Sequence, residues 1–131
     1  MEPKLHFLQE EFPALLSKLA ADARGSWGVL NGQQMVEHFI EVVLVAAGKI
    51  PLQIFTPADR LPKMREFLFS DAPFRENTKN PLMKDEPAPA RLPDMPTAIS
   101  ELNRAMQTFL KTYEKDQAKE VVNPFFGALN F

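Results

Sequence analysis

The chain has 131 residues, 45% of them hydrophobic, and a formal net charge of −2 at pH 7, which indicates one folded domain with its own core. It contains no cysteine, which excludes disulfides, thiolate metal sites and cysteine catalysis. The charge balance and the lack of any lysine or arginine run argue against a nucleic-acid interface. With no signal-peptide pattern and no apolar stretch long enough for a membrane span, we expect a cytoplasmic protein.

A first helix is predicted from about Pro3, because leucines and one phenylalanine recur at helical spacing. Its apolar positions are Leu5, Leu8, Phe12, Leu15, Leu16 and Leu19. Pro13 should kink or split this helix near Phe12, since proline lacks the backbone N–H that helical bonding requires. His6 lies beside the stripe and is interpreted as a solvated residue.

The best-marked helix runs from Asn31 to Gly48. Asn31 and Gln34 have the spacing of a capping box, and glycine at position 48 is typical of a helix end. Glu37 and Glu41 are predicted to mark the solvated side of this helix. The opposite, apolar stripe is expected to face the core and contains Met35, Phe39, Val42, Val43 and Ala46.

Two residues of this region have both a structural and a functional interpretation. His38 lies at the edge of the apolar stripe, where it is either a hydrogen-bonded core histidine or a metal ligand. Trp27 is either a hydrophobic lid on the start of the helix or an aromatic wall of a pocket. Spacing alone favours the structural interpretation of each.

Nine of the twelve prolines fall between Pro51 and Pro96, so this stretch is predicted to be a long excursion between helices. A short helix is expected from Pro57 to about Phe69, followed by irregular chain from Asp71 to Pro96. The segment FRENTKNP, which includes Asn77, is either a solvated loop or a source of polar groups at a pocket mouth.

A third long helix is predicted from Pro96 to Tyr113, capped by Asp94 or Thr97 and fading between Asp116 and Glu120. Its apolar seam is Ile99, Leu102, Met106, Phe109 and Tyr113. The hydrophobic segment VVNPFFGALNF follows. We expect Phe125 and Phe126 to dock on the bundle, with Asn130 in position to cap a further helix.

Two motifs resemble the DinB-like (YfiT-like) metalloprotein superfamily, and more narrowly an uncharacterised bacterial group within it. The first, WGVLNGQQMVEHF, matches the pattern W-G-x-[ML]-N-x-x-Q-M-x-x-H at Trp27, Gly28, Leu30, Asn31, Gln34, Met35 and His38. The second, NPFFGALNF, is similar to a P-F-F-G-x-L segment that precedes the final helix of that group. The resemblance spans nearly the whole chain. It implies an all-α four-helix bundle whose last helix is short or missing here, often in a dimer.

The resemblance also implies a divalent metal, zinc or nickel, held by three histidines, of which His38 matches the one on the second helix. The other two would lie on the last helix, and no histidine follows His38 in this chain. Either the chain is shortened, or the protein lacks the complete site. His38 and Glu41 alone would form a weak site.

Two functions of different classes follow, and the sequence leaves open whether the protein is an enzyme. The first is a metal-dependent enzyme of the thiol S-transferase kind, with His38 as a metal ligand and Trp27, Asn31, Gln34 and Asn77 near the substrate. The second is a non-enzymatic helical module that binds a small apolar molecule or associates with itself. An incomplete bundle exposes an apolar groove, so we expect a homodimer in which a second copy covers it.

Overall fold

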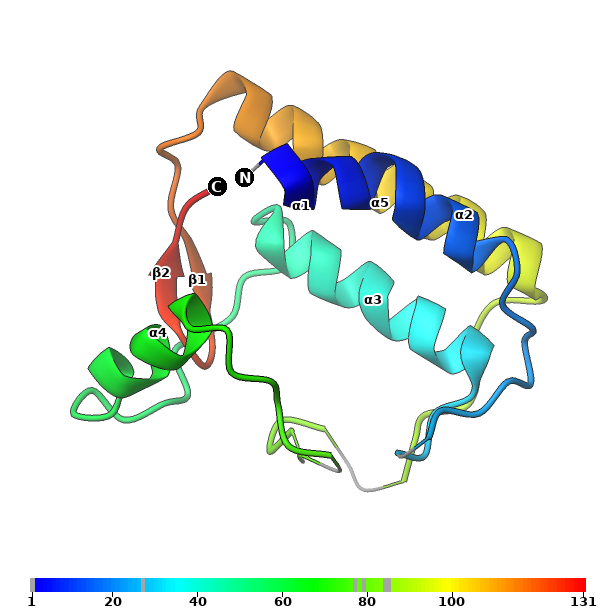
Figure 1. The fold of residues 1–131 in the computed structure, drawn as a ribbon, viewed down its shortest axis with the longest axis horizontal. Helices are drawn as coiled ribbons and strands as arrows, with labels where there is room; N and C mark the ends of the chain where they lie inside the picture. The colour runs from blue at the N-terminus through cyan, green and yellow to red at the C-terminus, as the bar shows by residue number, and fades with distance from the viewer. Residues whose placement is uncertain (1, 27, 77, 79, 84–85) are drawn as a thin grey trace.

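The computed structural model describes residues 2–26, 28–76, 78, 80–83 and 86–131. The described chain is mostly helical, with one short two-stranded sheet near its end. Figure 1 shows α3 (Gly32–Ala46) and α5 (Met95–Lys115) running along each other, with the hairpin and α4 (Leu61–Phe69) at one end of this pair. Among the described residues, no helix is long and apolar enough to cross a membrane.

The first helical run is irregular before Pro13, as the sequence predicts. It begins as α1 (Glu2–His6), continues as the π-helix η1 (Phe7–Glu11) and ends as α2 (Phe12–Leu16). The amide of Phe12 donates to the carbonyl of Phe7, one residue further back than in an α-helix. Proline has no N–H with which to donate to the carbonyl of Gln9, so the wider turns precede it.

Both caps of α3 form as expected. The Asn31 side chain accepts from the Gln34 amide at 2.8 Å, and the Gln34 side chain accepts from the Asn31 amide at 2.9 Å. Gly48, with φ of 76°, takes the left-handed conformation just beyond the helix. The boundaries of this helix were therefore readable from the local sequence.

The predicted orientation of α3 is correct for Glu41, which is exposed, and for Val43, which packs against the core, but it is wrong for other positions. Glu37 was placed on the solvated side but is 7% exposed, whereas Met35 and Val42 of the predicted core stripe are 38% and 43% exposed. The core uses the other face of α3, together with α2 and α5. It consists of Leu16, Val36, Ile40, Met95, Ala98, Leu102 and Ala105.

Helix α5 begins and ends close to the predicted positions. Asp94 is its N-cap and accepts from the Thr97 amide at 2.9 Å. Hydrogen bonds with the Thr97 side chain and with this amide hold the pKa of the Asp94 carboxyl below its ordinary value. Leu102 and Tyr113 of the predicted seam are buried, while Ile99, Met106 and Phe109 are half-buried. Alanines 98 and 105 complete the buried face, and their small side chains let α3 approach closely.

The carboxyl-terminal segment forms a β-hairpin, which corrects the all-α prediction. Strands β1 (Val121–Asn123) and β2 (Gly127–Leu129) pair antiparallel. The Asn123 side chain accepts from the amides of Phe125 at 2.8 Å and Phe126 at 3.1 Å, and Gly127 has φ of 82°. Asparagine and proline at the start of a turn and glycine at its end favour this geometry. Phe126 is buried and Phe125 half-buried, so the docking of this segment is confirmed.

The segment before α4 and α4 itself hold the hairpin. Thr56 donates its hydroxyl to the Phe125 carbonyl at 2.9 Å. Arg65 of α4 donates to the carbonyls of Ala128 at 2.8 Å and Phe126 at 3.3 Å. These bonds join the hairpin to α4 and to the segment before it, while β1 itself contacts α3.

Candidate functional site

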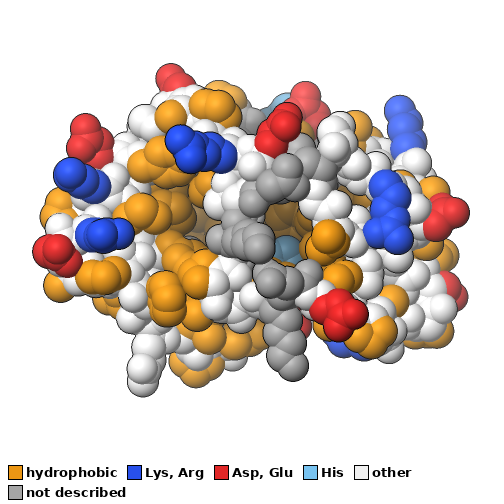
Figure 2. All heavy atoms as spheres, turned by 90° about the horizontal axis from the view of Figure 1, so that it is seen from below, with side chains coloured by type: hydrophobic (Ala, Val, Ile, Leu, Met, Phe, Trp, Pro, Cys, Tyr) orange, Lys and Arg blue, Asp and Glu red, His pale blue; other side chains and the backbone are white. Residues whose placement is uncertain are grey.

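A cleft of about 570 Å³ lies between the hairpin and the face of α3 that does not contact α5. Its walls come from five parts of the chain, including α1 and η1 through Leu5 and Leu8. Figure 2 shows hydrophobic side chains bordering a hollow on one face of the molecule. The volume falls within the range of roughly 300–1,000 Å³ that small-molecule sites occupy.

The exposed stripe of α3 lines this cleft. Val42, Val45 and Ala46 face it from α3, and Leu52 faces it from the connector that follows. Val42 and Ala46 belong to the stripe that the sequence assigned to the core. Apolar residues at helical spacing predict a face that avoids water, and a cleft wall satisfies that pattern as well as a core does.

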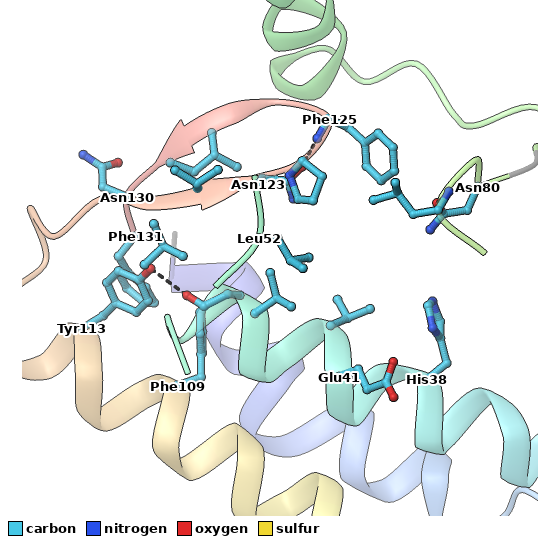
Figure 3. Close-up of a pocket in the computed structure, with 18 of the residues that line it drawn as sticks. His38, Glu41, Leu52, Asn80, Phe109, Tyr113, Asn123, Phe125, Asn130 and Phe131 are labelled. Carbon is cyan, nitrogen blue, oxygen red and sulfur yellow. Dashed lines mark hydrogen bonds between the residues drawn. The ribbon is translucent and has the colours of Figure 1, made fainter. Parts of the chain in front are cut away.

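Aromatic rings close one end of the cleft. Phe109 and Tyr113 of α5 have ring centroids 5.1 Å apart, and the Phe131 ring stacks on Tyr113 at 5.5 Å. The Tyr113 hydroxyl donates to the Ala46 carbonyl at 2.8 Å and so ties α5 to the last turn of α3 (Figure 3). Burial raises the pKa of the Tyr113 hydroxyl, because a buried phenolate would lose its hydration.

The opposite end of the cleft is polar. Figure 3 places His38, Glu41 and Asn80 together there, the first two from α3 and the third from the proline-rich excursion. His38 is half-buried, and its ring lies 6.3 Å from that of Phe39. Within the described chain, neither His38 nor Glu41 has a hydrogen-bond or ion-pair partner. Both side chains are therefore available to a ligand.

A smaller cavity of about 110 Å³ adjoins this polar end. His38, Glu41 and Met83 line both spaces. The remaining lining residues of the small cavity are Leu30, Gln34, Glu37, Ala88, Pro89 and Arg91. His38 and Glu41 thus lie where the apolar cleft meets a smaller cavity, whose lining mixes polar and apolar side chains.

The buried Glu37 lines the small cavity, and its hydrogen bonds fix the neighbouring part of the excursion. Its carboxylate accepts from the Arg91 amide at 2.8 Å, and from the Leu92 amide and the Gln33 side chain at 3.4 and 3.1 Å. The Arg91 guanidinium lies 4.0 Å from the same carboxylate. A buried carboxylate requires such partners, and here they fasten the excursion to α3.

The structure does not bring all of the predicted site residues together in the cleft. His38 lies in the cleft as described above, and Gln34 borders only the smaller cavity. Asn31 is engaged in the helix cap, and the Gln34 side chain, besides capping, donates to the Ala88 carbonyl at 3.0 Å. Trp27 and Asn77 lie outside the described residues.

The sequence interpretation missed most of the cleft. It does not name Leu5, Leu8 or the carboxyl-terminal residues as site residues, although Leu129 and Phe131 line the space. Asn80, which also lines it, belongs to the segment FRENTKNP, for which a role at a pocket mouth is one of the two interpretations. The turn signal Asn-Pro-Phe-Phe-Gly could have revealed the hairpin. No local signal places that hairpin opposite α3, because the placement depends on contacts between distant parts of the chain.

The metal implied by the DinB-like resemblance needs three or more protein ligands. In the part of the chain that the structure describes, no group of three histidine, cysteine or acidic side chains is placed to hold a metal ion. His38 and Glu41 supply two donors, one fewer than such a site uses. The donor set at His38 therefore does not fit a tightly held metal without a ligand from elsewhere.

Comparisons with known proteins give no assignment: no family model, no curated protein and no solved structure matches this chain.

Proposed function

We propose that this protein is a binding module for a small, largely apolar molecule, which occupies the cleft between α3 and the carboxyl-terminal hairpin. The observation that carries the proposal is the cleft itself: about 570 Å³, with apolar and aromatic walls and a few polar groups, among them His38, Glu41 and Asn80. Binding sites for small molecules have this composition, in which apolar walls supply affinity and a few polar groups fix orientation.

The cleft walls are also well supported. The hairpin is held by Thr56 and Arg65, and α3 is capped at its start and packed on α5 over its length. A site whose walls are held before the ligand arrives loses less conformational entropy on binding. This support favours a binding site over an accidental gap between helices.

The test is a calorimetric titration with octan-1-ol, a neutral probe with an apolar chain. We expect saturable binding of one molecule per chain. Val42→Trp, which fills the cleft, should weaken binding at least about tenfold, the equivalent of roughly 1.4 kcal/mol. Leu15→Trp is the matched control, because Leu15 is a helical residue, 57% exposed, on α2 and away from the cleft. Equal affinity of the two variants and the wild type would contradict the proposal.

The metal-dependent DinB-like enzyme is the competing proposal, and it rests on the two sequence motifs. Plasma mass spectrometry of the purified protein separates the two. Near-stoichiometric zinc or nickel that disappears in His38→Ala would favour the enzyme, since it would require further ligands around His38. A homodimer remains a prediction of the same resemblance, and light scattering at micromolar concentration tests it.

A further inference from the structure

The charges around the polar end of the cleft specify the kind of head group that a ligand could place there. Glu41 has no partner within the described chain, and it borders both the cleft and the small cavity. A carboxylate beside apolar walls gains from a cationic or hydrogen-bond-donating partner, because such bonds are stronger than those between neutral groups.

The cations nearby do not neutralise this carboxylate. Arg91 faces the small cavity but lies between Glu37 at 4.0 Å and Glu101 at 3.7 Å, so its charge is already matched by two carboxylates. Lys4 lines the large cleft from α1, and it is exposed, as Glu41 is. Among the described residues that line the two spaces at this end, the carboxylates are those of Glu37 and Glu41, and Glu37 is the one that Arg91 lies beside.

The shape of the two spaces matches an amphipathic molecule. The small cavity of about 110 Å³ begins where His38 and Glu41 stand, and the apolar cleft extends from the same point toward Phe109 and Phe131. A compact polar head therefore has room at the junction, while an apolar body lies along the cleft. The Asn80 side-chain oxygen already accepts from the Leu82 amide at 2.9 Å, which leaves its second lone pair and the amide nitrogen for a ligand.

We propose that the ligand is an amphipathic amine, whose ammonium group lies among His38, Glu41 and Asn80 and whose apolar body extends toward the aromatic end. This inference rests on the proposed function, since it names the ligand class of the same cleft. A carboxylate head group is disfavoured because it would face Glu41, and no described residue at the junction offers it a free cation.

Three probes with the same chain length test the head group: octylamine, octan-1-ol and octanoate, each titrated at pH 7 below its micelle concentration. We expect octylamine to bind about tenfold more tightly than octanoate, with octan-1-ol between them. The preference should shrink in 1 M salt, where the screening length falls to about 3 Å.

Glu41→Gln should lower the ratio of octylamine affinity to octan-1-ol affinity about tenfold. Glu114→Gln is the matched control, because Glu114 is an exposed glutamate of α5 outside the cleft. Octanoate binding as tightly as octylamine, or an unchanged ratio in Glu41→Gln, would overturn the amine proposal while leaving the proposed function intact if octan-1-ol binds. Failure of all three probes would overturn both.

Discussion

The two faces of α3 have nearly the same apolar content and opposite roles. One face packs on α5 and contains Val36 and Ile40, which are almost completely buried, with Gln33 and Glu37 buried beside them. The other contains Met35, Phe39 and Val42, which remain more than a third exposed, and part of it lines the cleft. Apolar content therefore does not distinguish a core face from the wall of a cleft. The sequence predicts that the face with Met35 and Val42 is buried, and the buried polar residues Gln33 and Glu37 show that the core lies on the other face.

The largest effect is expected from shortening a buried side chain that packs against the core face of α3. Leu102 is 1% exposed and packs in the cluster that joins α3 to α5. Leu102→Ala should lower the free energy of unfolding by about 2–5 kcal/mol, because it removes buried contacts and leaves a cavity. Urea denaturation measures this. Leu82→Ala, at a half-exposed cleft position, should cost less than about 1 kcal/mol. Equal losses would mean that the cleft is a second core.

The second comparison is between two glutamates of α3, Glu37 on the core face and Glu41 on the cleft side. Glu37→Gln replaces one accepting oxygen with an amide donor that faces N–H groups, and should cost about 1–3 kcal/mol of unfolding free energy. Glu41→Gln, one helical turn away on the cleft side, should change the same quantity by less than about 0.5 kcal/mol. The thermal unfolding midpoints of the two variants, measured under the same conditions, test this difference in stability. A larger loss for Glu41 would reverse the assignment of the two faces.

The smallest expected effect concerns the hydrogen bond between Tyr113 of α5 and Ala46 of α3. Tyr113→Phe removes the hydroxyl that donates to the Ala46 carbonyl and should cost about 0.5–1.5 kcal/mol at pH 7. Burial raises the pKa of Tyr113 above its ordinary value of 10.0, so the folded state holds this proton more tightly than the unfolded state. Its contribution is complete below pH 10 and is lost as the pH rises through the folded pKa. Denaturation between pH 9 and 11 should therefore show a steeper loss of stability in the wild type than in Tyr113→Phe.

The sequence predicted the features that depend on neighbouring residues. The capping box of Asn31 and Gln34, the Asp94 cap and the irregular helix before Pro13 each follow from contacts within five residues. The face of α3 that packs on α5 does not, since Glu37 becomes buried only because amides 54 and 55 residues away bind it. The cleft likewise depends on the hairpin, whose position is set by Thr56 and Arg65. Apolar residues at helical spacing predict that one face of a helix avoids water, but they do not predict which part of the molecule covers that face.

The long excursion between α3 and α5 has a consequence for how the molecule can change over evolutionary time. Its residues Asn80, Leu82 and Met83 form one wall of the cleft, while Gln34 and Glu37 of α3 fix the part of the excursion just before α5. The entropy of closing a loop grows only with the logarithm of its length, so even doubling the length costs about 0.6 kcal/mol. Insertions and deletions between α4 and residue 86 can therefore reshape this wall of the cleft while the helical core keeps its stability.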